Sequence, residues 1–377
     1  MYLKKITLTN YRNYEHLEVN FPQKINLLQG ANAQGKTNLL EAIYYLALGR
    51  AYRSFREDPL IKWGQQFFLI KGEVENRHGL VNLAVLVEQT EAITRKEIKV
   101  NSLKIERLSD FFGNLTAVLF APENLNIVQG TPALRRKLLD DDLSQVSPGY
   151  YLLLQKHRQL LKQRNHLLKK IKITGKGYSQ IEVWDEQLKT TAAQIINKRL
   201  AVLEKLNPLT RLMQRKLTGG RENLELKYLF NRTQEIKKGV DLVSIIESTA
   251  QEVKEREYRR GITLWGPQRD DFLLTLNGQN LKIYGSQGQQ RTAVLAIKLA
   301  ELEFFKSESG EYPLLLLDDV LSELDTQRRL YLLNIIQEKP IQCFLTTTVQ
   351  GSSLFRNTST LGSFYVQNGV LKEKMIE

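Results

Sequence analysis

Apolar and polar residues alternate with strand periodicity toward both ends of the chain and recur at helical spacing between them. Short alternating or apolar runs predict early strands at residues 3–9, 17–21, 25–29, 67–74, 80–87, 93–100 and 118–120. Similar runs predict later strands at residues 272–276, 279–283, 314–317 and 341–345. Apolar spacings of three and four predict helices after residue 37 and over residues 287–306. This pattern predicts an α/β protein.

The middle of the chain has a helical and highly charged pattern instead. After Pro148-Gly149, apolar positions step by three and four, and a glycine-containing turn at residues 175–177 leads to a second helix. Two helices joined by a short turn form an antiparallel arm. We therefore predict one α/β domain made of residues 1–130 and 261–377, interrupted by a mostly helical domain at residues 131–260.

The charge balance points to an anionic partner. The 377 residues include 54 Lys and Arg against 41 Asp and Glu, a formal net charge of +13. Such an excess attracts nucleic acid or acidic lipid, although it also serves simple solubility. We expect nucleic acid to be the partner.

Cysteine content and hydropathy indicate a compartment. The single cysteine, Cys343, excludes a disulfide within the chain, which suits a reducing environment. The first residues have no apolar core of signal-peptide length, and the run at residues 314–317 is far too short to span a bilayer. We expect a cytoplasmic protein with no membrane segment.

A phosphate-binding motif follows the strand predicted at residues 25–29. Its eight residues match G-x-x-x-x-G-K-[ST] without a mismatch: Gly30, Ala31, Asn32, Ala33, Gln34, Gly35, Lys36 and Thr37. In this motif backbone amides bind phosphate oxygens, the lysine neutralises the β- and γ-phosphates, and the hydroxyl binds Mg²⁺. A chance glycine turn is the alternative, but the motif lies between a predicted strand and an amphipathic helix, as the mechanism requires. The motif predicts binding of ATP or GTP.

An apolar strand at residues 314–317 ends in two carboxylates. Asp318 is positioned to hold Mg²⁺ opposite the phosphate loop, and Asp319 to orient or deprotonate the attacking water. Alone the pattern is weak, since apolar strands often end in a surface Asp. With the phosphate loop in the same chain, it predicts a catalytic set of Lys36, Asp318 and Asp319, with Thr37 and Asp318 as the metal ligands.

Residues 286–290, Ser-Gln-Gly-Gln-Gln, resemble the signature of ABC-type ATPases. They keep the serine, the first glycine and the final glutamine of that signature, at Ser286, Gly288 and Gln290. The alternative is a plain helix cap, and both roles are compatible. A serine hydroxyl and helix-end amides would bind the γ-phosphate of a nucleotide held by another subunit. Residues 322–325, Ser-Glu-Leu-Asp, match the D-loop of the same class.

With these motifs, the chain resembles the RecF family of bacterial recombination and repair ATPases, of the ABC/SMC class. The similarity covers essentially the whole chain and includes four further motifs, at residues 11–14, 49–54, 122–123 and 266–271. It also includes the short insertion, where SMC proteins carry long rods. The resemblance implies an ABC/SMC-type ATPase head with a mixed sheet, interrupted by a helical domain with a short arm.

The same resemblance implies a function. It implies an ATP-dependent homodimer with two nucleotides and Mg²⁺ between phosphate loop and partner signature. It implies binding of single-stranded and double-stranded DNA at gaps and junctions, work with RecO and RecR to load RecA, and support of the SOS response. Asp319 in place of the usual Glu, and residues 346–348 (Thr-Thr-Thr) in place of the usual His, suggest slow, DNA-dependent ATP hydrolysis that acts as a switch. Gln129 is a candidate for the Q-loop glutamine.

Basic residues supply candidates for DNA contact. The segment 150–172 holds seven Lys or Arg and no acidic residue, although a charge run is often only the solvated side of a helix. Arg50 and Arg53 would contact DNA, support the nucleotide site, or form a plain surface pair. The candidates are Arg50, Arg53, Arg135, Arg136, Lys156 and Arg158.

Two other functional classes compete with a repair ATPase. A transporter-type nucleotide-binding subunit would carry the same nucleotide motifs, but the basic charge and the incomplete signature disfavour it. A chromosome-organising protein would carry a long rod and a hinge, for which the insertion at residues 131–260 leaves no room.

Overall fold

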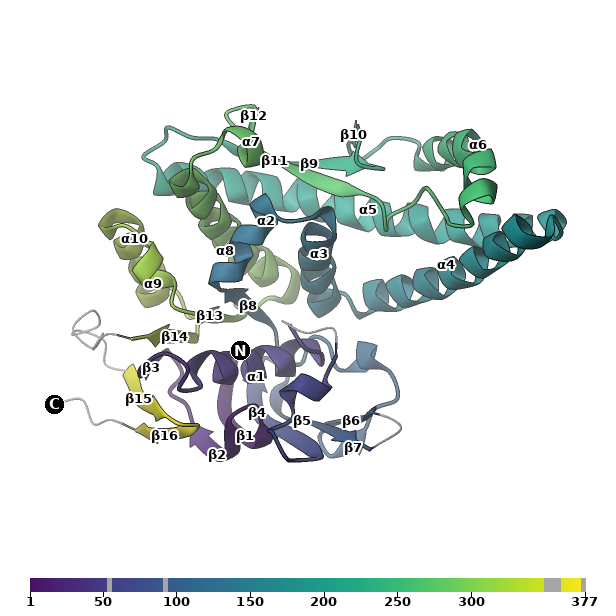
Figure 1. The fold of residues 1–377 in the computed structure, drawn as a ribbon. Helices are drawn as coiled ribbons and strands as arrows, with labels where there is room; N and C mark the ends of the chain where they lie inside the picture. Colours follow the sequence, from purple (N-terminus) through teal and green to yellow (C-terminus); the bar gives the residue numbers. More distant parts are fainter. Residues whose placement is uncertain (53–55, 91–93, 349–360, 374–377) are drawn as a thin grey trace. The chain divides into compact units, whose positions relative to one another are not determined.

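The chain folds into two compact units, seen in the computed structural model, which describes residues 1–52, 56–90, 94–348 and 361–373 (Figure 1). The first unit contains Met1–Asn124 and Ile297–Glu377, and the second contains Leu125–Ala296. The early boundary lies close to the predicted one. The late boundary differs, because residues 261–296 cluster with the second unit and not with the ATPase part, where the sequence pattern placed them.

Two six-stranded sheets form the first unit. The antiparallel sheet has the order β2-β1-β4-β5-β6-β7, from β1 (Tyr2–Tyr11), β2 (Tyr14–Asn20), β4 (Phe67–Asn76), β5 (Gly79–Gln89), β6 (Thr94–Val100) and β7 (Leu103–Lys104). The other sheet has the order β16-β15-β3-β14-β13-β8, from β3 (Ile25–Gln29), β8 (Ala117–Phe120), β13 (Leu314–Leu317), β14 (Cys343–Thr347), β15 (Leu361–Gln367) and β16 (Val370–Glu373). This sheet is mixed, since only β16 runs antiparallel to its neighbour.

The helix after the phosphate loop, α1 (Lys36–Leu48), packs against strands of both sheets. Eleven of its 13 residues are buried, so it is apolar nearly all round rather than amphipathic. This unit also contains the short helices η1 (Asp58–Leu60), η2 (Leu108–Asp110) and α9 (Val320–Glu323), the longer α10 (Thr326–Glu338), η3 (Pro122–Leu125) up to Asn124, and the second half of α8 (Gln287–Ser309). The predicted strands at residues 25–29 and 314–317 are confirmed as β3 and β13.

The second unit is mostly helical, as predicted. Its helices are α2 (Asn126–Gln129), α3 (Pro132–Val146), α4 (Pro148–Thr174), α5 (Tyr178–Leu217), α6 (Leu242–Arg260), α7 (Leu281–Tyr284) and the first half of α8 (Gln287–Ser309). Helices α4 and α5 run side by side and form the predicted antiparallel arm (Figure 1). No helix within the described ranges is long and apolar enough to cross a membrane.

This unit also contains a four-stranded sheet, of which the sequence pattern predicted the hairpin after residue 271 and missed the two strands between residues 224 and 236. Its order is β10-β9-β11-β12, from β9 (Leu224–Phe230), β10 (Gln234–Ile236), β11 (Asp271–Leu276) and β12 (Gln279–Asn280). Strand β11 pairs with β9 along six positions, which holds the later segment in the second unit. The hairpin at Asn277-Gly278 is confirmed, with both residues at positive φ (49° and 82°). The predicted strand at residues 279–283 ends at Asn280, because α7 begins at Leu281.

Buried arginines bind the helices of this unit together. Arg164 of α4 donates to Asp185 of α5 at 2.5 Å and to Glu257 of α6 at 2.7 Å. Arg199 of α5 donates to both carboxylate oxygens of Asp140 in α3, at 3.1 and 3.0 Å. Buried ion pairs are strongly destabilising when one partner is removed, so each pair ties its helices into one arrangement.

His157 of α4 is buried at a comparable junction. Its Nδ1 lies 3.0 Å from Thr191 Oγ1 of α5, and its Nε2 lies 3.1 Å from Gln268 Oε1. Burial lowers the pKa of His157 from 6.5 to about 4. Because the unfolded chain binds a proton near pH 6.5 and the folded chain only near pH 4, stability falls as the pH is lowered through this window.

Replacing His157 by Gln should remove this pH dependence while keeping an amide for both hydrogen bonds. By linkage, the loss of unfolding free energy between pH 7 and pH 5 should be smaller in the variant by about 2 kcal/mol. Urea unfolding at the two pH values measures it. His166→Gln, an exposed histidine on the same helix, is the control and should behave like wild type. An equal pH response in all three proteins would show that His157 does not titrate as described.

Candidate nucleotide-binding site

The phosphate loop connects β3 to the first turn of α1. Lys36, the first residue of α1, is buried, and its ammonium donates to the carbonyls of Gly30 at 2.6 Å and Ala31 at 2.7 Å. Burial lowers the pKa of Lys36, while the carboxylates of Asp319 and Asp318 act in the opposite direction. The ammonium therefore lies within the phosphate loop and is bonded to neutral carbonyls. The phosphate oxygens of a bound nucleotide would be stronger acceptors, because they are charged.

Close backbone approach explains the glycine at the start of the loop. Gly30 has φ +152°, and a Cβ atom there would lie 2.3 Å from the carbonyl oxygen of Val366 in β15. Because the obstacle is backbone, it cannot move aside as a side chain could. The loop therefore packs directly on β15, a strand that the sequence pattern did not predict.

Two neighbouring turns hold the other end of the loop. Asn13, in the turn between β1 and β2, donates its Nδ2 to Gln34 O at 2.9 Å and accepts from Asn38 Nδ2 at 2.8 Å. In the β15–β16 turn, Gly369 N donates to Gln34 O at 3.1 Å and Asn368 N to Gln34 Oε1 at 2.8 Å. Sequence reasoning singled out Asn13 only through the motif at residues 11–14, and it missed the later turn.

Asp318 joins the end of β13 to α1 and β14. Its Oδ1 accepts from the Thr37 hydroxyl at 2.8 Å and from the Thr346 hydroxyl at 2.9 Å. The Thr346 oxygen also accepts the backbone N–H of Asp319 at 2.8 Å. Asp319 has left-handed backbone angles (φ 52°, ψ 25°), an unfavourable conformation for a residue with a Cβ atom. Thr346 therefore positions both carboxylates.

These residues line one cavity of about 280 Å³ in the first unit. Its wall is made by the phosphate loop, by the two aspartates, by Thr346 and Thr348, and by Pro122 and Glu123 after β8. A hydroxyl, a carboxylate and an ammonium on a glycine turn are the groups that a magnesium-bound triphosphate requires. The residues present therefore fit ATP and Mg²⁺, and the assignment of Thr37 and Asp318 as metal ligands stays a prediction.

A larger hollow lies elsewhere in the first unit and has a different character. It measures about 790 Å³ and covers the open face of the antiparallel sheet. Its charged residues form ion pairs, such as the cross-strand pair of Lys5 in β1 with Glu18 in β2 at 2.7 Å. Such paired charges on an exposed sheet face are normal surface chemistry.

The signature residues belong to the second unit, at the start of α8. Ser286 Oγ accepts from Gln289 N at 3.2 Å, and Gln289 Oε1 accepts from Ser286 N at 2.9 Å. This reciprocal pair is a capping box, so the predicted helix cap is confirmed. Ser286 and Gly288 are exposed. Their contact with a nucleotide stays a prediction.

Gln290 and Gln129 have structural partners within the second unit. Gln290 is 6% exposed, and its Nε2 donates to Gly285 O at 3.0 Å. Gln129 Nε2 donates to Gln290 Oε1 at 2.9 Å. The surroundings of Gln290 therefore explain it as a brace for the loop before α8. In the segment that follows β8, the residues that line the nucleotide cavity are Pro122 and Glu123. The role of Gln129 as the Q-loop glutamine stays a prediction.

Arg135, a candidate for DNA contact, is withdrawn. It is 7% exposed and forms two parallel bonds to the Asp271 carboxylate, at 2.7 and 2.8 Å. Its remaining nitrogen, Nη1, donates to the carbonyls of Ile127 and Gly130. The sequence motif at residues 135–137 could not reveal this, because Asp271 lies 136 positions away.

The other candidates differ in exposure. Lys156 and Arg158 are exposed on α4, Arg136 and Arg50 are partly buried, and Arg53 lies outside the described residues. Of the seven basic residues in segment 150–172, Arg164 is buried and the other six are exposed. Their contact with DNA stays a prediction.

Replacing Thr346 by Val should impair nucleotide hydrolysis. The change keeps the side-chain shape but removes the hydroxyl that donates to Asp318 and accepts from Asp319 N. Loss of about 1.4 kcal/mol of positioning energy corresponds to a roughly tenfold slower turnover in a steady-state phosphate-release assay. Thr346→Ser keeps the hydroxyl and should retain most of the rate. Equal rates in the Val and Ser variants would contradict a positioning role.

Comparison with known proteins agrees with this geometry. Residues 2–372 match the family model described as the RecF/RecN/SMC N terminal domain. The chain is 41% identical over 375 residues to the DNA replication and repair protein RecF of Bacillus mycoides (strain KBAB4), covering 98% of each chain. RecF of Bacillus cereus (strain G9842) is similar at the same identity and coverage. A solved structure of the recombination mediator protein RecF with ATP superimposes with a TM-score of 0.90 at 34% identity, covering 99% of this chain and 98% of that one. An Smc head domain from Pyrococcus furiosus shares the fold, with a TM-score of 0.56 at 16% identity, covering 99% of this chain and 96% of that one.

The chain therefore belongs to the RecF family, within the wider group of RecF, RecN and SMC proteins.

Proposed function

We propose that this protein is a cytoplasmic, ATP-dependent DNA-binding protein of recombinational repair and replication, which dimerises around ATP and hydrolyses it slowly. One observation supports this proposal most strongly: Lys36, Thr37, Asp318 and Asp319 line a single cavity. The solved RecF structure with ATP, similar over nearly the whole chain, supports the choice of nucleotide.

Each residue of this cavity has a chemical role in the proposal. The amides of the phosphate loop and the ammonium of Lys36 bind and neutralise the triphosphate. Thr37 and Asp318 hold Mg²⁺, which supplies electrostatic stabilisation of the transferring phosphoryl group when bound. Asp319 accepts or orients the proton of the attacking water.

Slow turnover follows from the same residues. Asp319 is one methylene shorter than the glutamate common in ABC ATPases, and it is fixed by the backbone bond to Thr346. No histidine occurs in the segment 343–348, so water activation rests on one short carboxylate. A site of this kind suits a switch, in which bound ATP sets the conformation and hydrolysis ends it.

The signature helix supplies the proposed contact between two copies. The Ser286 oxygen accepts the capping bond from Gln289 N, which leaves its O–H free to donate. Ser286 and Gly288 are exposed at the N-terminus of α8, where the helix dipole favours an anion. In the proposed homodimer, this end binds the γ-phosphate held by the other copy.

The partners come from the family. The relatives are named DNA replication and repair proteins, and the solved RecF structures are assigned to a pathway named RecFOR. We extend this to binding of gapped DNA and of single-strand/double-strand junctions, to RecO and RecR as partners, and to loading of RecA with support of the SOS response. The +13 charge agrees with a DNA partner.

ATP should convert the protein from monomer to dimer, as measured by light scattering. Lys36→Ala should bind no ATP and stay monomeric. Ser286→Arg should still bind ATP but stay monomeric, because a large cation replaces the hydroxyl at the tip of α8. ATP affinity, measured by calorimetry, separates the two effects.

Ser248→Arg is a matched control, since Ser248 is an exposed serine on α6 outside the proposed contact. It should dimerise like wild type. Normal ATP-dependent dimerisation of Ser286→Arg would contradict the shared nucleotide.

DNA binding separates this proposal from a transporter-type nucleotide-binding subunit. We expect ATP to strengthen binding to gapped duplex more than to single strands or blunt duplex, with an affinity that falls steeply with salt. Fluorescence anisotropy with and without ATP measures this. If the protein binds none of the three DNAs at low salt, the DNA-binding proposal fails and a transporter-type subunit is favoured.

A further inference from the structure

The motif Gly266–Asp271 of the second unit takes no part in the nucleotide site. It follows α6 and leads into β11, and three of its six residues are buried while the other three are partly buried. Its backbone carbonyls are the acceptors for several arginines from other elements. These contacts suggest that the motif is a scaffold for charged side chains.

Three arginines, here called the arginine triad, converge on this segment. Arg136 of α3 donates its Nη1 to Asp270 O at 2.6 Å. Arg232, in the β9–β10 turn, donates its Nε to Arg269 O at 3.2 Å. Arg269 donates its own Nε to Thr263 O at 3.1 Å. Each guanidinium uses one nitrogen on the backbone and keeps the others for a further acceptor.

No ion pair joins a member of the triad to a carboxylate among the described residues, although the charges of Asp271 and Asp140 act on Arg136 and that of Glu257 on Arg269. Buried arginines nearby behave differently, since Arg135 and Arg199 each form an ion pair. Desolvation, followed by the charge of Arg199 on Arg136 and by that of Arg232 on both, lowers the pKa of Arg136 and of Arg269. Like charges held together in this way favour binding of an anion that neutralises them.

A buried carboxylate fixes the most exposed member of the triad. Asp270 accepts the Tyr228 hydroxyl at 2.6 Å and the Asn231 N–H at 2.7 Å, and burial raises its pKa to about 6. The bond to Asn231 holds a turn in which Arg232 has φ 70°, a conformation that arginine rarely adopts. Strain of this kind persists where the surroundings impose it and is concentrated at functional sites.

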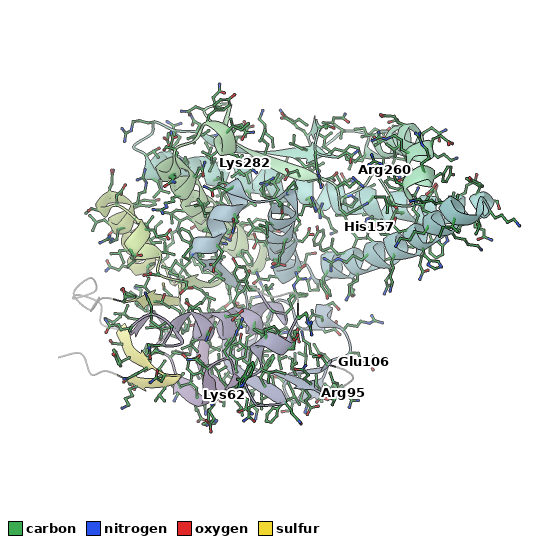
Figure 2. All side chains as sticks on the ribbon, in the orientation of Figure 1. Lys62, Arg95, Glu106, His157, Arg260 and Lys282 are labelled. Atoms are coloured by element: carbon green, nitrogen blue, oxygen red, sulfur yellow. The ribbon has the colours of Figure 1, made fainter. Side chains whose placement is uncertain are left out.

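Further basic residues surround the triad. Helix α4 contacts the motif through His157, which bonds Gln268, and Asn165 of the same helix accepts from Thr263 N, just before the motif, at 2.8 Å. Lys156 and Arg158, on either side of His157, are exposed. The charges of Arg260 and Arg256 of α6 reach Arg269. Figure 2 labels His157 on α4 and Arg260 at the end of α6.

This arrangement fits an extended polyanion better than a single small ion. The basic residues lie on α3, α4, α6 and the β9–β10 turn of one unit, which gives them the spread of successive backbone phosphates. Planar guanidinium groups with several unused nitrogens match phosphate oxygens in pairs.

We infer that Arg136, Arg232 and Arg269 form a docking site for the phosphate backbone of DNA, with Asp270 as the residue that positions Arg232. The inference rests on the proposed DNA-binding function and assigns that function a surface. It replaces the withdrawn candidate Arg135 and keeps Arg136, Lys156 and Arg158 in the interface.

The test is the salt dependence of binding to gapped duplex DNA, with ATP present. Arg136→Gln and Arg269→Gln remove the charges, and Arg232→Asn does so with a residue that tolerates positive φ. Each single variant should bind roughly threefold to tenfold more weakly, and the slope of log affinity against log salt should fall by about 1 per lost contact. Arg232→Asn changes only an exposed turn, so it remains informative if a buried variant fails to fold.

Arg211→Gln is the matched control. It removes one exposed arginine from α5 of the same unit, 12 residues beyond Arg199 and therefore about 18 Å along the helix. It should leave the slope unchanged. ATP-dependent dimerisation of every variant, followed by light scattering, should equal that of wild type.

Two failures are distinguishable. If wild-type protein binds no DNA, the proposed function itself fails. If wild type binds and the three triad variants keep its affinity and slope, the function stands and the triad belongs to another anionic partner, such as an acidic protein segment. That second result overturns the inference.

Discussion

One carboxylate oxygen, Asp318 Oδ1, connects the parts of the chain that must meet for nucleotide chemistry. It accepts hydroxyls from Thr37 at the start of α1 and from Thr346 in β14, residues separated from it by 281 and 28 positions. Because hydrogen bonds to a charged group are strong and directional, these contacts fix the phosphate loop against the carboxyl end of the parallel strands. The same threonine fixes Asp319 through its backbone N–H. Thr346 therefore orients the Asp318 carboxylate and the backbone of Asp319 together.

In the second unit, pairing with a carboxylate distinguishes the arginines that stabilise the fold from those that can bind an anionic partner. Arg135, Arg164 and Arg199 are each paired with an Asp or Glu and connect elements of the unit internally, α3 with β11 in the case of Arg135 and helix with helix in the other two. Arg136, Arg232 and Arg269 donate to backbone carbonyls, and in the described part of the chain none of them forms an ion pair. A neutral acceptor orients a guanidinium without cancelling its charge, so these three keep their attraction for phosphate. The paired arginines therefore stabilise the unit, and the other three are the ones we propose for binding DNA.

The nucleotide motifs could be predicted because their chemistry is local. Eight consecutive residues specify the phosphate loop, and an apolar strand ending in Asp318 specifies its counterpart. Strands β9 and β10 were missed because their alternation is enclosed by long helical segments. Anchors such as Asn13 and Gly369 depend on pairing between distant turns, which no single window contains. Arg135 and Arg158 look equivalent in the sequence, and only the contact of Arg135 with Asp271 distinguishes them.

Hydrogen exchange of backbone amides, with and without ATP, tests the proposed shared nucleotide most directly. A nucleotide held between two copies predicts protection of amides in residues 30–37 and also in residues 286–289, and the second protection should increase with protein concentration. Protection confined to residues 30–37 at every concentration would mean that the tip of α8 does not contact the bound nucleotide, and it would contradict the proposed dimer.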